Sequence, residues 1–376
     1  MTRLAQVTAA LDELYPPTLA EDWDTVGLFC GDPDALVQRV LFAVDPVEVV
    51  AAEAVERQCQ LLVTHHPLHL GGTTSVAQDT PKGRVLARLQ LAGCGLFVAH
   101  TNADRARPGV NDALAALFDL QDPSPVDPVL EQLDSLVVLV PVAAAAALEA
   151  ALTAAGAGRL GAYDSCSWST VGTGAFRPLP GARPAVGEVG ELQRLDEVRL
   201  ETVVPAAVRR AVLQALHRVH PYETPAFHLA PSVPLPGPLG LGRVGDLPAP
   251  LELVALVELA ARVLPPTVAG VRALGYPGQV VRRLAVCGGA GDSALGRAAA
   301  AGADAVLTAD LRHHRAGEAP EGLALLDAAH WATEWPWLPD AAARLASVTG
   351  VETVVSTTCT DPWTVHRPPA PRSPSA

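Results

Sequence analysis

The sequence predicts an α/β protein in which two related α/β halves form one domain, interrupted by a ferredoxin-like α+β insert. Three observations predict this: a strand–helix–strand pattern in the first third, a similar pattern in the last third, and a βαββαβ pattern between them. With 376 residues, the chain is long enough for two or three domains. We expect the first half at residues 1–126, the insert at 127–243, the second half at 244–365 and a disordered tail at 366–376.

In the first half, apolar runs alternate with helical patterns. RVLFAVD (Arg39–Asp45) and CQLLVTHHP (Cys59–Pro67) flank the helical stretch VEVVAAEAVERQ, and a helix over Gly83–Ala92 leads to the run GLFVAHTNAD. Buried parallel strands are continuous apolar runs and need a crossover helix between them. The pattern therefore predicts βαβ units.

The last third repeats this scheme with RRLAVCGG, the helix DSALGRAAAAGA, the strand ADAVLTAD and then LALLDAAHWATE. QLLVTHH aligns with DAVLTAD, and FVAHTNAD aligns with LDAAHWATE. Each third thus carries one H-x-x-x-[DE] pair after an apolar run, where open α/β sheets place their sites. We infer a duplicated unit whose two copies build one shared site.

The region between the copies has a different pattern. DSLVVLVP, SWSTVGTGAFRP, EVRLETVVP and TPAFHLAP are predicted strands, with helices after the first and third of them. This is the ferredoxin-like order. The following stretch APSVPLPGPLGLG is rich in turn formers and is predicted to be an irregular linker.

Composition excludes several classes of protein. Hydrophobic residues make up 49% and charged residues 18%, which favours a globular protein over a disordered one. The formal net charge of -13 disfavours bulk nucleic-acid binding. Neither a signal-peptide pattern nor a long uninterrupted apolar run is present, and the six cysteines are scattered without a CxxC pair. We expect a cytoplasmic protein with reduced thiols and no membrane association.

The strand ends carry donors suited to a metal centre. His65 and His66 end one predicted strand, Asp104 follows another, and His330 and Glu334 follow the matching strand of the second copy. Imidazole with carboxylate suits Zn, Fe, Mn, Co or Ni. Five donors exceed the four of a closed structural zinc site, so two divalent ions with a bridging carboxylate fit better, and such pairs support hydrolysis.

Other polar residues are secondary candidates. His100 is the best orienting residue and a catalytic candidate, because it precedes Asp104 by one helical step. His69 is an exposed loop residue or a substrate contact, and His314 or Asp310 could line the cleft. His313, like His69 and His314, is a weaker candidate than His100 for the orienting role. Two further features allow two interpretations each: the loop CGGAGDS is an anion site or a tight turn, and the pair His220 and His228 are metal ligands or structural residues.

The motifs VTHHPL, AHTNAD with RPGVNDALA, AVCGGAGDS, DAAHWATEWPWL, WDTVGL and HPYETPAF resemble the GTP cyclohydrolase 1 type 2 homologue family, also called the Ngg-interacting factor three-like family. The resemblance covers nearly the whole chain. It includes the long form of the family, in which a module similar to P-II signalling proteins is inserted.

The resemblance implies a toroidal homohexamer with dinuclear metal centres facing its cavity. It also implies the ligands that spacing indicated, which are all present: His65, His66, Asp104, His330 and Glu334. The chain departs from the family pattern at Thr25, Ala309 and Arg315, so no substrate contact is transferred.

Two functions remain open at this stage. The first is a metal-dependent hydrolase of a nucleotide, which opens the guanine ring of GTP or cleaves a phosphate ester, with His100 as proton carrier. The second is a non-catalytic metal-binding or regulatory scaffold protein. The sequence does not select between them.

Overall fold

The computed structural model describes residues 2–367, so the predicted disordered tail lies outside the described residues from position 368 onward. The chain forms two compact units. Unit 1 comprises the residues up to Val129 and from Pro238 onward, and unit 2 comprises Leu130–Gly237.

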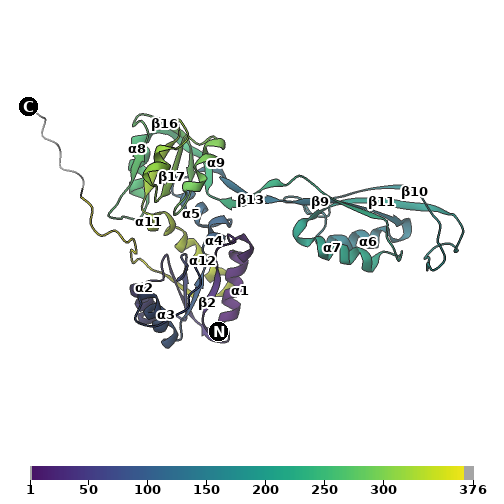
Figure 1. Ribbon diagram of the computed structural model, residues 1–376, viewed down its shortest axis with the longest axis horizontal. Helices are drawn as coiled ribbons and strands as arrows, with labels where there is room; N and C mark the ends of the chain where they lie inside the picture. The colour runs from purple at the N-terminus through teal and green to yellow at the C-terminus, as the bar shows by residue number, and fades with distance from the viewer. Residues whose placement is uncertain (1, 368–376) are drawn as a thin grey trace, which may run out of the picture. The chain divides into compact units, whose positions relative to one another are not determined.

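The first sheet of unit 1 has the strand order β19-β4-β5-β6-β2. Its strands are β2 (Gly27–Cys30), β4 (Arg39–Ala43), β5 (Leu61–Thr64), β6 (Gly95–Val98) and β19 (Glu352–Val355). All pair in parallel except β2, which is antiparallel to β6. The crossover helices α2 (Glu48–Glu56) and α3 (Pro81–Leu91) lie side by side (Figure 1). The βαβ pattern of the first third is confirmed.

The second sheet of unit 1 has the order β15-β18-β17-β16-β14-β7. Its strands are β7 (Gln121–Ser124), β14 (Arg243–Glu252), β15 (Arg272–Leu274), β16 (Val280–Val286), β17 (Ala305–Ala309) and β18 (Ala324–Ala328). The central strands β16, β17 and β18 are parallel, like β4, β5 and β6. The helices that follow strands of this sheet are α8 (Leu253–Val263), η3 (Asp292–Ala294), α9 (Leu295–Ala300), α10 (His313–Gly317) and α11 (His330–Glu334).

Both sheets are covered on both faces, which explains the continuous apolar runs. In β4, Val40 and Phe42 belong to one hydrophobic cluster, and Leu41 and Ala43 belong to another. The first cluster also contains Leu284 of β16, so the two sheets share a core. Helices and short elements around this core are β1 (Thr2–Arg3), α1 (Leu4–Leu14), η1 (Pro17–Leu19), β3 (Leu36–Val37), α4 (Thr101–Arg105), α5 (Val110–Ala116) and α12 (Trp337–Thr349).

Unit 2 is an antiparallel sheet with helices on one face (Figure 1). In chain order its elements are β9 (Leu133–Pro141), α6 (Val142–Ala154), β10 (Ser167–Phe176), β11 (Gln193–Pro205), η2 (Ala206–Val208), α7 (Arg209–Val219) and β12 (Phe227–Pro231). The strand order is β10-β11-β9-β12. Alternate residues of β9, such as Leu136 and Val138, pack with Leu148 of α6 and Leu216 of α7 in a separate core.

The prediction of an irregular linker at residues 230–242 is wrong. This stretch contains β13 (Leu235–Leu241), which pairs with β8 (Asp127–Glu131) in a sheet of two strands. Proline lacks a backbone N–H, and a strand with a free edge tolerates it because that edge needs no donor. Both strands of a two-stranded ribbon have such an edge.

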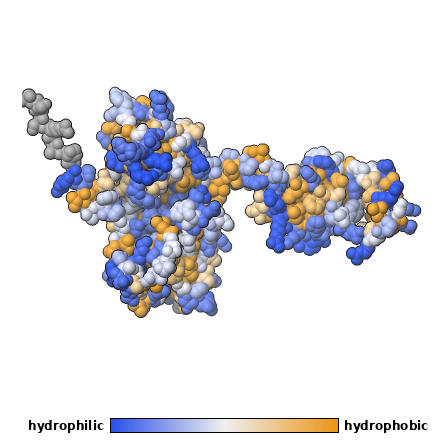
Figure 2. Space-filling view, in the orientation of Figure 1, coloured by the Kyte–Doolittle hydropathy of each residue, from blue (hydrophilic) through white to orange (hydrophobic). Residues whose placement is uncertain are grey.

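On the face drawn in Figure 2, hydrophilic and hydrophobic residues are interspersed over the surface of unit 1. No helix within residues 2–367 has the length and apolar character needed to cross a bilayer.

Candidate metal centre

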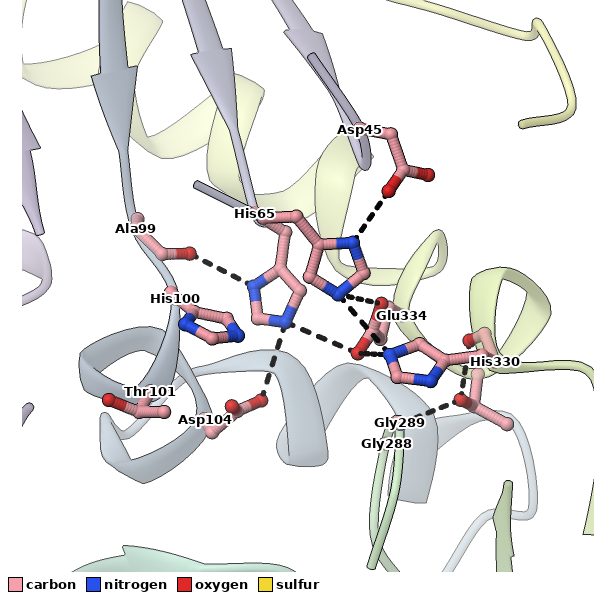
Figure 3. A network of polar contacts seen from close by, with 12 residues as sticks. Asp45, His65, Ala99, His100, Thr101, Asp104, Gly288, Gly289, His330 and Glu334 are labelled. Atoms are coloured by element: carbon pink, nitrogen blue, oxygen red, sulfur yellow. Dashed lines mark hydrogen bonds and ion pairs between the residues drawn. The ribbon is translucent and has the colours of Figure 1, made fainter. Parts of the chain in front are cut away.

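The five predicted ligands lie together in unit 1 (Figure 3). His65 and His66 directly follow β5, Asp104 is on α4 after β6, and His330 and Glu334 are on α11 after β18. Because β5 and β6 are adjacent and parallel, their carboxyl ends meet at one edge of the sheet. One helical turn separates His330 from Glu334, so both side chains reach the same point.

Glu334 is the central group of this cluster. Its Oε1 lies 3.3 Å from His65 Nε2 and 2.9 Å from His330 Nε2, and its Oε2 lies 3.2 Å from His66 Nε2. His66 Nε2 and His330 Nε2 are 3.2 Å apart, and His65 Nε2 is 3.8 Å from Asp104 Oδ1. The carboxylate of Glu334 therefore faces two sets of donors, one around His65 and one around His66.

Hydrogen bonds direct the Nε2 lone pairs of the histidines inward. The Nδ1 partners are Ala99 O for His65 (2.9 Å), Asp45 Oδ1 for His66 (2.7 Å) and Asp310 Oδ2 for His330 (2.7 Å). Since these oxygens accept the Nδ1 protons, each neutral ring presents an unprotonated Nε2 to the centre. Two such lone pairs 3.2 Å apart repel each other unless a proton or a metal ion lies between them.

The electrostatics of the cluster favour positive charge. Burial lowers the pKa of each histidine, but the charge of Glu334 outweighs it, so the pKa of His65 is raised, that of His66 is raised well above its usual range, and that of His330 is raised to about 9. Burial would raise the pKa of Glu334, yet His66 and His65 hold it well below its usual range. Burial raises the pKa of Asp104 to about 6.

Two buried carboxylate oxygens of the cluster lack a hydrogen-bond partner within the described part of the chain. Asp104 Oδ1 and Glu334 Oε2 have no hydrogen-bond partner among residues 2–367. Buried polar atoms are normally paired, so these two oxygens suit a bound cation as their partner. Ligand atoms about 2.1 Å from one metal ion are about 3.0–3.4 Å apart, close to the 2.9–3.2 Å found around His66, His330 and Glu334. The residues fit divalent ions, and this His/Glu group could hold one.

The glycine-rich loop CGGAGDS gives space to the site, and its amides at Gly288, Gly289 and Gly291 are already paired within the protein. Three of its N–H groups donate to side chains of the protein: Gly288 to Asn111 (2.9 Å), Gly289 to Thr333 (2.9 Å) and Gly291 to Thr308 (2.8 Å). Of the two readings of this loop, the tight turn is the one that the structure favours.

Gly289 is required where it lies, and its replacement by alanine is expected to weaken metal binding by at least about tenfold. Its φ of 64° is in the left-handed region, and an added Cβ would overlap Glu334 Oε1 and lie 3.0 Å from His330 Nε2. Calorimetric titration with Mn²⁺ or Zn²⁺ measures the effect. Gly296→Ala is the control, because nothing lies within 4 Å of its added Cβ. Equal metal affinity in the two variants would contradict the geometry.

His100, the predicted orienting and catalytic residue, caps α4 and belongs to the same cluster. One nitrogen each of His65, His66 and His100 lie within 4.8 Å of one another. The Nδ1 of His100 donates to Asp24 (3.0 Å). His100 contacts Asp104 through the backbone, where the Asp104 N–H donates to the His100 carbonyl. Burial and the nearby charge of His65 lower the pKa of His100 to about 4.

The remaining histidines lie outside the cluster. His220 uses both nitrogens in unit 2, because Nε2 bonds Leu139 O and Nδ1 accepts from Tyr222 N–H, which favours its structural role over a metal pair with His228. His69 contacts the ring of Phe29. His313 and His314 contact each other on α10.

Sequence reasoning missed two carboxylates that orient site histidines. Asp45 bonds His66, and Asp24 bonds both His100 and the Thr101 hydroxyl. The signals were present, since Asp45 ends the run RVLFAVD and Asp24 lies in WDTVGL. Asp310, predicted to line the cleft, accepts a hydrogen bond from His330 through its side chain. The backbone of Asp310 is in the left-handed region, with φ 56°.

Comparison with known proteins agrees with these motifs. Residues 2–362 match the family Duf34/NIF3 (NGG1p interacting factor 3). The chain belongs to the NIF3 family.

Relatives with the same organisation cover this NIF3-family chain almost completely. A Mycobacterium tuberculosis protein named GTP cyclohydrolase 1 type 2 homolog is 50% identical over 367 residues, which cover 96% of this chain and 96% of that protein. A Mycobacterium leprae protein of the same name is 49% identical over 367 residues, which cover 96% of this chain and 95% of that protein. A Bacillus cereus crystal structure described as related to NIF3 has a TM-score of 0.81 and 33% identity, and covers 97% of this chain and 99% of its own. The mixed α/β fold is therefore that of the family.

Proposed function

We propose that the chain holds two divalent metal ions and hydrolyses a nucleotide. The observation that carries the proposal is the position of Glu334, whose Oε1 faces both His65 and His330 and whose Oε2 faces His66. One ion would be held by His65, Asp104 and Glu334, and the other by His66, His330 and Glu334. Such donors suit Zn, Fe, Mn, Co or Ni.

Different residues of the chain would exclude water, face the substrate and accept a proton in such a reaction. Bound divalent ions would supply Lewis-acid chemistry suited to hydrolysis. His65 and Glu334 are almost fully buried, which keeps water away from their side of the site, whereas His66 and His330 are partly exposed toward a substrate. His100, with Nδ1 held by Asp24, has its second nitrogen free to accept a proton beside His65 and His66.

A nucleotide is proposed because the mycobacterial relatives are named GTP cyclohydrolase 1 type 2 homolog. Both GTP ring opening and phosphate ester hydrolysis are compatible with the donor set. The alternative is a non-catalytic metal-binding or regulatory scaffold. The observation that favours it is unit 2, which has its own core and supplies none of the five donors.

We also propose that unit 2 is a ferredoxin-like insert between two related halves. Its chain order β9-α6-β10-β11-α7-β12 and its strand order β10-β11-β9-β12 support this. The parallel triplets β4-β5-β6 and β16-β17-β18 support a duplication. A cytoplasmic homohexamer remains part of the proposal, and light scattering that gives a monomer would contradict the hexamer.

The hydrolase proposal predicts that metal-loaded protein releases formate or phosphate from GTP. The His65→Ala variant should lose metal and at least about 100-fold in rate, because one ion position loses its only imidazole. Formate and phosphate are measured separately, together with the metal content of each sample. His228→Ala, an exposed histidine of unit 2, is the control. Full activity in a His65→Ala sample that has lost its metal would reject the proposal.

A further inference from the structure

Two cavities flank the cluster in unit 1 and meet at Asp45 and His66, which line both. The first, of about 600 Å³, also contains Trp331 and Trp363, and we name it the tryptophan pocket. The second, of about 730 Å³, contains Lys82, and we name it the lysine pocket. Both volumes are in the range of small-molecule sites. A single elongated ligand could therefore occupy both pockets and pass His66.

The tryptophan pocket offers flat apolar surface. Trp331 is 6% exposed and forms a wall from α11, whereas Trp363 is 67% exposed and comes from the segment after β19. This segment is fixed near the metal ligands, because the Thr360 hydroxyl donates to Asp45, the carboxylate that bonds His66. An exposed indole held beside a cavity is a surface on which a heterocyclic ring stacks.

The charges of the tryptophan pocket select the edge of that ring. Its acidic residues are Asp45, Asp310, Asp327 and Asp361, and its basic residues are Arg272, His366 and the two site histidines His66 and His330. The guanidinium of Arg272 is already paired with Asp327 at 2.5 Å. Asp361 Oδ2 is buried and has no hydrogen-bond partner among residues 2–367. Asp361 thus offers an acceptor to a ring whose edge donates N–H groups.

The lysine pocket offers a positively charged side chain. Lys82 is the only lysine in the sequence. It lies in the first turn of α3, and the residues before and in the first turn of α2 line the same cavity. Two acidic residues line this pocket. Glu48 pairs with Arg84 at 2.8 Å, and Asp45 bonds His66 and the Thr360 hydroxyl. The ammonium of Lys82 is therefore available to an anionic group near His66.

We propose that the substrate is a heterocyclic nucleoside phosphate whose ring stacks on Trp363 in the tryptophan pocket and whose phosphate binds Lys82 in the lysine pocket. This inference rests on the proposed function, because the bond that reacts would lie between the two pockets, beside His66. Lys82 and Trp363 are binding residues in this arrangement. Their separate roles can be measured with probes that carry the ring, the phosphate or both.

The test uses metal-loaded full-length protein and calorimetric titration with GMP, guanosine and ribose 5-phosphate. Lys82→Met should weaken GMP and ribose 5-phosphate by about tenfold and leave guanosine unchanged, with recovery in Lys82→Arg. Trp363→Ala should weaken GMP and guanosine by about tenfold and leave ribose 5-phosphate unchanged, with recovery in Trp363→Phe. Matched controls are Arg88→Met, on the same helix as Lys82, and Trp168→Ala, an exposed tryptophan of unit 2.

The proposal is overturned if wild-type protein binds none of the probes, or if either variant affects all three probes alike or none of them. Binding is separated from turnover by measuring formate and phosphate release in the same samples. If the variants show the expected pattern and nothing is hydrolysed, the hydrolase proposal fails and the two-pocket assignment stands. If GTP is hydrolysed equally by wild type, Lys82→Met and Trp363→Ala, the two-pocket assignment fails and the hydrolase proposal stands.

Discussion

Glu334→Gln is expected to remove nearly all bound divalent metal while the chain stays folded. The two oxygens of Glu334 face different histidines, so one substitution affects both proposed ion positions. The neutral amide removes a charge from a fully buried site and places an NH₂ group where a ligand oxygen was. We expect metal affinity to fall at least about 100-fold at each position, as measured by metal analysis after gel filtration and by titration.

The same substitution separates a metal centre from a network of buried ion pairs. Without metal, Glu334 holds charged histidines, and its loss would chiefly lower stability. Glu258→Gln makes the same chemical change at an exposed position of α8 and is the control. A Glu334→Gln protein that retains the metal content of Glu258→Gln would show that this carboxylate is not a ligand.

Arg243→Met is expected to have the largest effect on stability. The Arg243 side chain is fully buried and forms two hydrogen bonds of 2.7 Å with the carboxylate of Asp112. Its other N–H groups donate to the carbonyls of Gly240, Gly242 and Ala106. Methionine would leave Asp112 without its cationic partner and three carbonyls without the donor that Arg243 supplies. Removing one partner of a buried ion pair costs about 3–5 kcal/mol. That is a large part of a typical folding free energy of about 5–15 kcal/mol.

Denaturant unfolding monitored by far-UV circular dichroism measures this loss. Arg344→Met is the matched control, because Arg344 pairs with Asp340 at 2.6 Å on the partly exposed side of α12. Such pairs contribute about 0–1 kcal/mol. If the two substitutions lowered the free energy of unfolding equally, the buried pair would not have the role that its contacts indicate.

The strands of unit 1 were predictable because their neighbours cover both faces. Val40 and Leu41 are consecutive residues of β4, and both are buried, in different clusters. A continuous apolar run of this length therefore predicts a central parallel strand directly. β13 was missed because its prolines and glycines are typical of turns, and its pairing with β8 depends on chain far away in the sequence.

The same distinction applies to the candidate site. The clustering of the candidate ligands was predictable because His66 follows a strand and His330 and Glu334 are spaced for one helical turn. Asp24 and Asp45 lie in motifs that the sequence shows, but their partners were not predictable, because Asp24 meets His100 only after the chain has folded. No local pattern records that contact. The tryptophan pocket beside His66 depends in the same way on Trp363, which follows the last strand.

The most direct test of the proposed centre is the number of divalent ions per chain in wild type, His65→Ala and His330→Ala. Each histidine belongs to a different proposed ion position, with Glu334 shared. The account predicts two ions in wild type and one in each variant, measured by plasma emission on protein loaded with excess Mn²⁺ or Zn²⁺ and then gel filtered. A wild-type protein that retains no ion, or a variant that retains as many ions as wild type, would contradict it.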